Sequence, residues 1–323
     1  MNPQKRNQNI DVLRAIAAFV VVFIHTPETS DDYSIHLFWL RFLPPANAIF
    51  AVLAGWFMVQ SLEKYTSLSS AQSFFKDRFR RILVPYLVWS AIYVCVNCVE
   101  KILRHKPFTY DFASVSGWVS LIFEGGGATQ LWFLVFLFYA QCLFCICYFS
   151  ARNIKWVGLI ILLLAISFSI CRSFTNHDFF LGKFLFMSEY LFLGSCMLIC
   201  GKIFLLRHQR CLFICSCLFI CLHIVWICFN KTSPIKEVLP VLYVCAALSS
   251  PQLTIPRWVS NMGTFSMGIY VVHCLVIAFG TLVFSKISFW NGGHITLFCL
   301  TMVYFLISYG VVLVLRKTRL PGV

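Results

Sequence analysis

Two ionisable side chains share the first apolar segment of the chain, Val12–His25. Arg14 and His25 are eleven residues apart, which in an α-helix is three turns plus ~20°, so both project from one face. They are separated by ~16 Å along the axis and offer a fixed cation at one level and a proton acceptor at another. Asp11, one turn before Arg14, can partly neutralise it. Arg14 could instead reach the lipid headgroups and His25 could cap the helix, but their shared face favours a functional pair.

Other titratable residues also lie within long apolar segments, where such groups are costly and mark candidate functional sites. The alternating direction of successive segments places Glu189 and His273 at a depth similar to that of His25. A carboxylate can orient a histidine ring that accepts a proton, so Glu189 is a candidate partner of His25. His223 is alone on an apolar stretch, and we interpret it as a packing histidine.

A cluster of basic residues precedes the third apolar segment, in the sequence K-D-R-F-R-R-I-L-V-P-Y. Arg78 and Arg81 are three residues apart and would share one face if this stretch is helical. The planar guanidinium group binds phosphate in a bidentate manner, so the pair is a candidate site for a phosphorylated ligand. The alternative is the ordinary positive charge of a cytoplasmic loop.

Long apolar segments must position all of these residues. Sixty per cent of the 323 residues are apolar or aromatic and 12% are charged, whereas a soluble domain has ~45–50% and ~25%. A spanning helix needs ~20 apolar residues, and the candidate segments are Val12–His25, Ala46–Leu62, Ile82–Val99, Leu131–Phe149, Trp156–Cys171, Phe184–Leu206, Leu212–Phe229, Val238–Leu248, Val259–Phe284 and Ile295–Leu315. We expect an all-α, polytopic transmembrane bundle of about ten helices. It should form a single domain over residues 1–323, with no fused soluble domain.

The distribution of basic residues predicts the membrane orientation. A formal net charge of +14 would suggest a nucleic-acid partner in a soluble protein, but here Lys and Arg lie in short loops, where they set topology. With the N-terminus inside, 16 of the 26 basic residues are cytoplasmic and 9 are external, with Arg14 inside a helix. We therefore predict that both termini are cytoplasmic, in a bacterial-type inner membrane. No small-residue cleavage site follows the first segment, so we expect a retained helix and not a signal peptide.

The 16 cysteines lie mostly inside apolar runs, where they behave as small hydrophobic residues. No pair of C-x-x-C motifs brackets a histidine at zinc-binding spacing, so the sequence predicts no metal site.

Five sequence blocks resemble, in order, those of the acyltransferase type three family of polytopic membrane proteins. I-D-V-L-R-A-I-A-A-F-V-V-V-F-I-H resembles the opening helix of the family, and the later blocks are Phe50–Phe57, Arg78–Tyr86, Leu131–Leu134 and Ser266–His273. Two positions depart from the family pattern. Ala54 stands where Ser is common, and Gln130 stands where His is frequent.

The resemblance implies transfer of an acyl group, usually acetyl, from cytosolic acyl-CoA to a hydroxyl group of a cell-surface or lipid-linked carbohydrate. His25 and Arg14 correspond to the essential first-helix pair of the family, and Arg78 and Arg81 match its arginine motif. Further substrate-binding candidates in the matching blocks are Trp132, Tyr270 and His273. The implied partners are the acyl-CoA donor, the carbohydrate acceptor and the lipid bilayer, without nucleic acid. Acetyl-CoA is a co-substrate, and no permanently bound cofactor is expected.

The residue chemistry agrees with this activity. A sugar hydroxyl is a poor nucleophile, and an imidazole with a reference pKa of ~6.5 can accept its proton during attack on the thioester. His25 is the expected general base, with Glu189 as the carboxylate that orients it. Arginines at the cytoplasmic side would hold the phosphates of coenzyme A. Direct transfer and an acyl-enzyme intermediate both remain open.

A secondary transporter or flippase of a glycan or lipid-linked substrate is the main alternative. Helix number and buried charges suit both classes, but transporters often carry internal repeats, and none is visible here. A membrane sensor or scaffold is a third alternative, which the absence of a recognisable soluble module disfavours.

Overall fold

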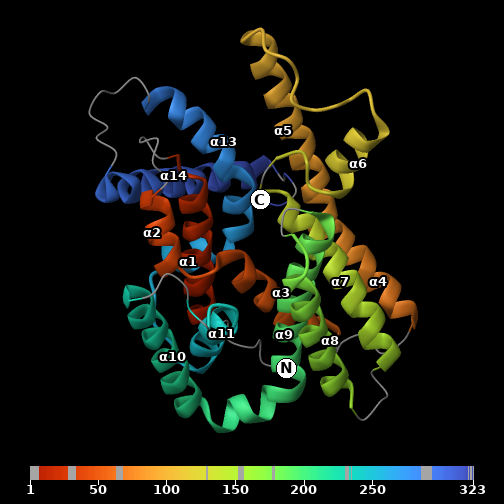
Figure 1. The fold of residues 1–323 in the computed structure, drawn as a ribbon, viewed down its shortest axis with the longest axis vertical. Coiled ribbons are helices and arrows are strands. Elements are labelled where there is room, and N and C mark those ends of the chain that lie inside the picture. The colour runs from red at the N-terminus through yellow and green to blue at the C-terminus, as the bar shows by residue number, and fades with distance from the viewer. Residues whose placement is uncertain are drawn as a thin grey trace. The chain divides into compact units, whose positions relative to one another are not determined.

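The computed structural model describes residues 7–27, 34–62, 68–128, 130–151, 156–176, 179–229, 233, 235–284, 293–318, 320 and 322. These residues form helices and connecting segments without a strand, so the predicted all-α fold is confirmed (Figure 1). The helices, in chain order, are α1 (Gln8–His25), α2 (Ser34–Phe42), α3 (Ala46–Leu62), α4 (Leu68–Arg78), the π-helix η1 (Phe79–Leu83), α5 (Val84–Leu103), α6 (Val115–Phe123), α7 (Trp132–Ala151), α8 (Val157–Ser173), α9 (Phe180–Arg207), α10 (Gln209–Phe229), α11 (Leu239–Ser249), α12 (Arg257–Thr264), α13 (Ser266–Phe284), α14 (His294–Leu315) and the 3₁₀-helix η2 (Arg316–Thr318).

Among the described residues, seven helical stretches are long and apolar enough to cross a membrane. The number rises to eight if α12 and α13, bent by 78° at their junction, are counted as one span. The remaining two predicted segments correspond to the shorter apolar helices α8 and α11. All ten predicted segments are therefore helical, while their number as membrane spans stays a prediction. The short helices α2 and α6 were not predicted, because each is much shorter than a span.

Helix α10 shows how lipid-exposed surface is organised. Its buried residues are few, and a stripe of large apolar side chains at helical spacing is exposed, comprising Ile214, Leu218, Leu222 and Val225. Exposure of this stripe to water is unfavourable, whereas contact with the hydrocarbon of a membrane is not. The chain is thus built as a multi-pass membrane protein.

The chain folds as two compact units. The first contains Met1–Leu53 and Cys200–Arg319, and the second contains Ala54–Ile199. The boundaries fall inside α3 and inside α9, so the chain leaves the first unit and later returns to it within continuous helices.

Helix α1 is the centre of the first unit and contacts α11, α12, α13 and α14 (Figure 1). Its closest approach is to α12, where a Cβ atom added to Gly263 would lie 2.0 Å from the carbonyl oxygen of Asp11. Only a residue without a side chain allows the two backbones to pack this closely.

Polar contacts tie the start of α1 to the segment after α11. The Asn9 side-chain amide donates to the carbonyl of Pro251 and to the carbonyl and hydroxyl of Ser250, while its oxygen accepts from the Leu253 N–H. The α1 N-cap is Asn7, whose side chain accepts from the Asn9 and Ile10 amides. These bonds hold one end of the helix that carries Arg14 and His25.

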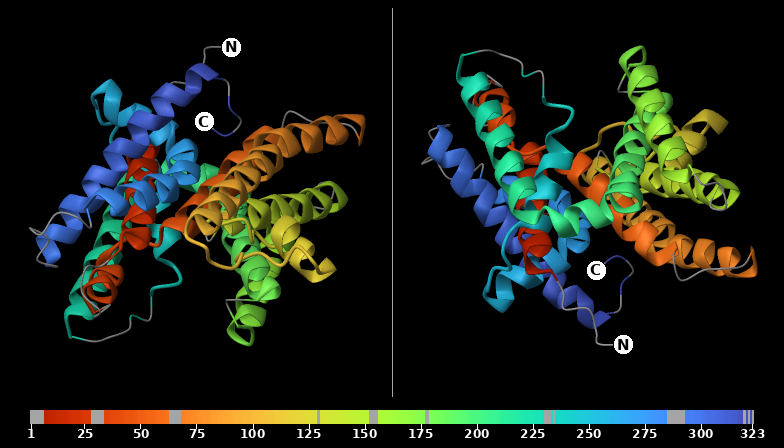
Figure 2. Two further views of the ribbon diagram at one scale, coloured as in Figure 1. Left: turned by 90° about the horizontal axis from the view of Figure 1, so that it is seen from above. Right: turned by 90° about the horizontal axis from the view of Figure 1, so that it is seen from below.

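In the second unit, α4, η1 and α5 follow one another as a long helical rod (Figure 2). The π-helical turn ends at Leu83, two residues before Pro85, and the Val84 N–H bonds to the Phe79 carbonyl five residues back. Proline has no N–H to donate and its ring clashes with the carbonyl four residues earlier, so a regular helix could not pass this point. The wider turn accommodates the proline within one continuous rod.

Helices α3 and α9 pack closely within the same unit. A Cβ atom on Gly55 would lie 2.0 Å from the Leu191 carbonyl oxygen, and the Ser195 hydroxyl lies 3.2 Å from the Gly55 carbonyl oxygen. Small residues at such a crossing let two backbones approach, as is usual between membrane helices.

Candidate active site

His25, Tyr270 and His273 come together in the first unit. His25 is the last residue of α1, and the other two lie one turn apart on α13. The ring centroids of His25 and His273 are 5.2 Å apart, and those of Tyr270 and His273 are 5.9 Å apart. His273 and Tyr270 are buried, whereas His25 is half-buried. Two residues 248 positions apart thus form one imidazole pair.

The tautomer of His273 follows from its hydrogen bonds. Its Nδ1 lies 2.7 Å from the Tyr270 carbonyl oxygen and 3.3 Å from that of Ile269. A carbonyl oxygen only accepts, so Nδ1 carries the hydrogen. In the neutral ring Nε2 then has a free lone pair, and the Cys274 Sγ lies 3.3 Å from it. His273 therefore presents an acceptor nitrogen towards the site.

The end of α1 that carries His25 is held by its neighbours. The Phe23 carbonyl accepts from the Thr26 N–H at 3.2 Å and from the Nε2–H of buried His36 at 2.8 Å. The hydroxyls of Thr26 and Thr301 lie 3.2 Å apart and link this end to α14. Carbonyl groups at a helix end need such partners, and here the partners come from α2 and from the residue after α1. These hydrogen bonds hold the end of α1 that carries His25 against α2 and α14.

Arg14 lies on the same helix as His25, and both are half-buried. Asp11, which the sequence suggested as a neutralising neighbour, is buried and its Oδ2 accepts from the Ser260 hydroxyl at 2.8 Å. Ser260 belongs to α12, so this bond joins α12 to the charged end of α1.

Glu189 lies in the second unit and has a partner that the sequence did not reveal. Its carboxylate forms an ion pair with Arg172 of α8, with Nε and Oε2 2.7 Å apart. A second Arg172 nitrogen, Nη2, donates to Oε1 at 3.5 Å. The two side chains are only 10% and 3% exposed. The guanidinium carbon also lies 5.6 Å and 5.8 Å from the ring centroids of Phe186 and Tyr190. The pair is thus a buried, neutralised charge set between aromatic rings.

Arg78 and Arg81 occupy different environments. Arg78 ends α4, is half-buried and stacks its guanidinium 4.6 Å from the Phe74 ring centroid. Arg81 lies within η1 and is exposed. The shared face expected for an α-helix does not apply across this junction, because the π-turn changes the angle between successive residues.

Trp132 is the first residue of α7 and follows a loop that contains Gly125 and Gly127. Gly125 has a φ of 81°, and a Cβ atom there would lie 2.3 Å from the Trp132 Cα. The Tyr110 hydroxyl donates to the Gly127 carbonyl at 2.7 Å, and burial raises the pKa of Tyr110. The buried residue Gln130 lies two residues before the start of α7. Trp132 is half-buried, with the Lys183 ammonium 6.0 Å from its ring centroid.

The interpretation of His223 as a packing residue agrees with its surroundings. It is buried on α10, and its Nε2 lies 3.3 Å from the Arg41 carbonyl, to which it must donate because that oxygen only accepts. The contact joins α10 to α2 within the first unit.

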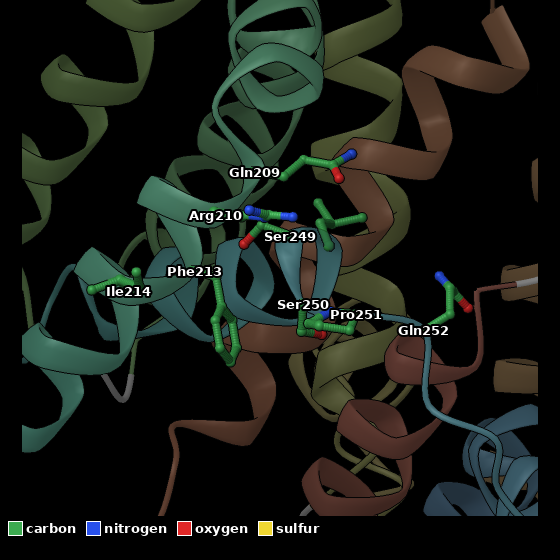
Figure 3. Close-up of a pocket in the computed structure, with 9 residues that line it drawn as sticks. Gln209, Arg210, Phe213, Ile214, Ser249, Ser250, Pro251 and Gln252 are labelled. Atoms are coloured by element: carbon green, nitrogen blue, oxygen red, sulfur yellow. The ribbon is translucent and has the colours of Figure 1, made fainter.

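A cavity of about 510 Å³ lies between the start of α10 and the end of α11. Figure 3 shows Gln209 and Arg210 on α10 close to Ser249 and Ser250. None of the site residues predicted from the sequence lines it.

Sequence reasoning missed two residues of these sites, Cys274 and Arg172. Cys274 directly follows His273 in the sequence, but it was interpreted, like the other cysteines in apolar runs, as a small hydrophobic residue. Arg172 directly follows the apolar segment Trp156–Cys171, and this position could have marked it as a charge at the end of a membrane helix.

The helices and their buried ionisable side chains define a multi-pass membrane protein with polar sites inside its helical units. Residues 7–316 match the family model of the acyltransferase 3 domain, described as an acyltransferase domain. The chain belongs to this acyltransferase family, and the resemblance of its five blocks is confirmed. No curated protein and no solved structure matches the chain.

Proposed function

We propose that this acyltransferase moves an acyl group, in the first instance acetyl, from cytosolic acyl-CoA to a hydroxyl group of a cell-surface or lipid-linked carbohydrate. The observation that carries the proposal is the half-buried imidazole of His25, held at the end of a well-anchored helix beside His273. A general base requires a neutral imidazole that is held in position and not fully enclosed by other side chains. Family membership supplies the acyl-transfer class.

In the proposed reaction, the acceptor oxygen attacks the thioester carbonyl carbon while His25 takes the hydroxyl proton. The carbon–sulfur bond then breaks, and the coenzyme A thiolate leaves and takes up the proton from the imidazolium. The products are an ester and free coenzyme A. His273 and Tyr270 shape the site around His25, and Arg14 supplies a cation on the same helix.

Donor binding is assigned to Arg78 and Arg81. Coenzyme A carries a pyrophosphate and a further phosphate, and arginine binds such groups through paired N–H donors. Half-buried Arg78 ends α4 and exposed Arg81 lies in η1, so each would contact the donor phosphates from its own side of the helix junction. Trp132 is assigned to substrate contact. Orientation of His25 by Glu189 stays a prediction. The ion pair with Arg172 also holds the Glu189 carboxylate in place.

The proposal is tested with membranes, radiolabelled acetyl-CoA and total cell glycans. Wild-type protein should transfer label to glycan. His25→Ala should lose transfer by ~10²-fold or more, which is the usual contribution of a general base. His223→Ala is the matched control, because it removes a buried packing histidine of the same unit, and it should retain transfer.

Labelled glycan at wild-type levels with His25→Ala would refute the base assignment. Movement of a glycan across the membrane without any incorporation of label would instead support a transporter or flippase.

A further inference from the structure

Three potential metal ligands meet where α1 and α13 approach each other. One nitrogen of His25, one of His273 and the Cys274 sulfur all lie within 4.8 Å of one another. They come from the end of α1 and from two successive residues of α13, so no sequence motif with metal-binding spacing links them.

His273 is arranged as a metal ligand. Metal-binding histidines almost always donate their second ring N–H to a carbonyl or carboxylate, which fixes the tautomer and aims the other nitrogen at the ion. Here Nδ1–H donates to the Tyr270 carbonyl at 2.7 Å, and Nε2 points to the Cys274 Sγ at 3.3 Å. The hydrogen bond that would orient His273 as a metal ligand, from Nδ1–H to the Tyr270 carbonyl, is therefore already formed in the structure.

The separations suit a small tetrahedral ion. Zinc–nitrogen bonds of ~2.1 Å and zinc–sulfur bonds of ~2.3 Å place neighbouring ligand atoms ~3.4–3.7 Å apart. His273 Nε2 and Cys274 Sγ are already near this distance. The widest pair must approach by roughly 1 Å, which rotation of the half-buried His25 ring can supply.

We propose that His25, His273 and Cys274 form a binding site for a thiophilic divalent cation of the zinc class. Two imidazoles and one thiolate are ligands that zinc prefers over magnesium or calcium. Three protein ligands leave the fourth position of a tetrahedral ion open to water or a small ligand. Binding releases the thiol proton to solvent, because the ligand is the thiolate.

The ion regulates transfer by occupying His25. A coordinated nitrogen has no lone pair left to accept the acceptor's proton, so the metal-bound protein is inactive and removal of the ion restores transfer. This consequence rests on the proposed function, whereas the binding site itself does not.

Binding is measured first, with cobalt(II) as a spectroscopic substitute for zinc and purified protein in detergent after chelator treatment. The Sγ atoms of Cys211 and Cys215 lie 3.9 Å apart on α10 and could bind a soft ion together, so both are changed to Ser in every sample. The protein should bind one cobalt ion with a thiolate-to-cobalt band, and zinc should displace it.

Cys274→Ala should abolish the thiolate band, and His25→Gln should weaken cobalt binding at least ~100-fold, beyond the loss seen for outer-shell changes. Cys299→Ala is the control, because it removes an exposed cysteine of the same unit, and it should keep the band. Absence of stoichiometric binding in the protein with Cys274 intact, or a band that persists in Cys274→Ala, would overturn the site.

Acyl transfer is measured second. Zinc should inhibit the protein with Cys274 intact and chelator should restore its activity, whereas the activity that Cys274→Ala retains should resist zinc. Loss of transfer on chelator treatment would overturn the regulatory role. Because cobalt binding is read without turnover, a protein that binds cobalt but transfers no acyl group would refute the proposed function and leave the site standing.

Discussion

Each candidate site residue has partners in the folded protein that influence its chemistry. His25 has an imidazole neighbour whose tautomer is fixed by a backbone carbonyl, and Glu189 has a guanidinium partner inside the second unit. Breaking a buried ion pair leaves an uncompensated charge in a medium that solvates it poorly. Substitution of Glu189 is therefore expected to lower the stability of the protein, in addition to its predicted effect on catalysis.

Glu189→Gln and Arg172→Met should each destabilise the protein by ~3–5 kcal/mol, because each leaves its partner charged and buried. The double variant should recover most of that loss, since both charges are then absent. Thermal unfolding in detergent measures the three variants. If the double variant is as unstable as the two single variants, the loss of the ion pair does not explain their destabilisation.

The same double variant separates stability from catalysis. We expect it to remain deficient in acyl transfer, because the carboxylate predicted to orient His25 is missing. Transfer at the wild-type rate by the stabilised double variant would restrict Glu189 to its structural role.

Arg78→Ala and Arg81→Ala should each raise the KM for acyl-CoA about tenfold, the loss expected for one charge-assisted hydrogen bond. High salt should mimic the change in the wild type, because ions screen attraction between exposed charges. The control is Arg104→Ala, an exposed arginine at the other end of the same rod that pairs with Glu100. Unchanged donor kinetics in both site variants would reduce the cluster to a topology signal.

At the scale of elements, close backbone contacts decide which helices can pack together. Helix α1 reaches α12 only because Gly263 has no side chain, and α3 reaches α9 through Gly55. Such contacts do not affect the chemistry directly. The contact at Gly263 sets the position of α1, the helix that carries His25, against α12.

Gly263→Ala should destabilise the protein by ~1–3 kcal/mol, since the new methyl group meets the Asp11 carbonyl and the helices must separate. Gly310→Ala is the matched control within the same unit, because nothing lies within 4 Å of a Cβ atom there. It should be stabilised by ~0.5–1 kcal/mol, as alanine is favoured over glycine in a helix. Thermal unfolding in one detergent compares them, and equal shifts of the two variants would contradict the predicted clash.

At the scale of the whole molecule, apolar surface and loop charge together set the membrane arrangement. Exposed apolar stripes such as that of α10 require hydrocarbon as their solvent. The excess of basic residues in alternate loops then favours one orientation over the other.

We predict that both termini are cytoplasmic and that the segment around Lys106 is external. Reporter fusions after Lys317 and at Val323 should give cytoplasmic activity, and a reporter inserted at Lys106 should report the opposite side. The basic residues of alternate loops are the physical reason, because they resist translocation. An external signal at the C-terminus would exclude an even number of spans.

The lipid environment, the helical class and the family could be predicted from the sequence, because they depend on composition, segment length and residues close together in the chain. Apolar runs near the length of a span required helices, and the blocks around His25, Arg81 and His273 carried the resemblance. These properties are local, so they can be recognised without knowing which segments touch.

The partners of the ionisable residues could not be predicted from the sequence and became known only from the tertiary structure. Arg172 and Glu189 are 17 positions apart, and His25 and His273 are 248 apart, so their contacts depend on how helices cross. It also revealed the π-turn before Pro85 and the meeting of Cys274 with two imidazoles. Helical periodicity predicts the face on which a residue lies but not the helix that covers that face, because backbone approach at residues such as Gly263 selects the neighbour.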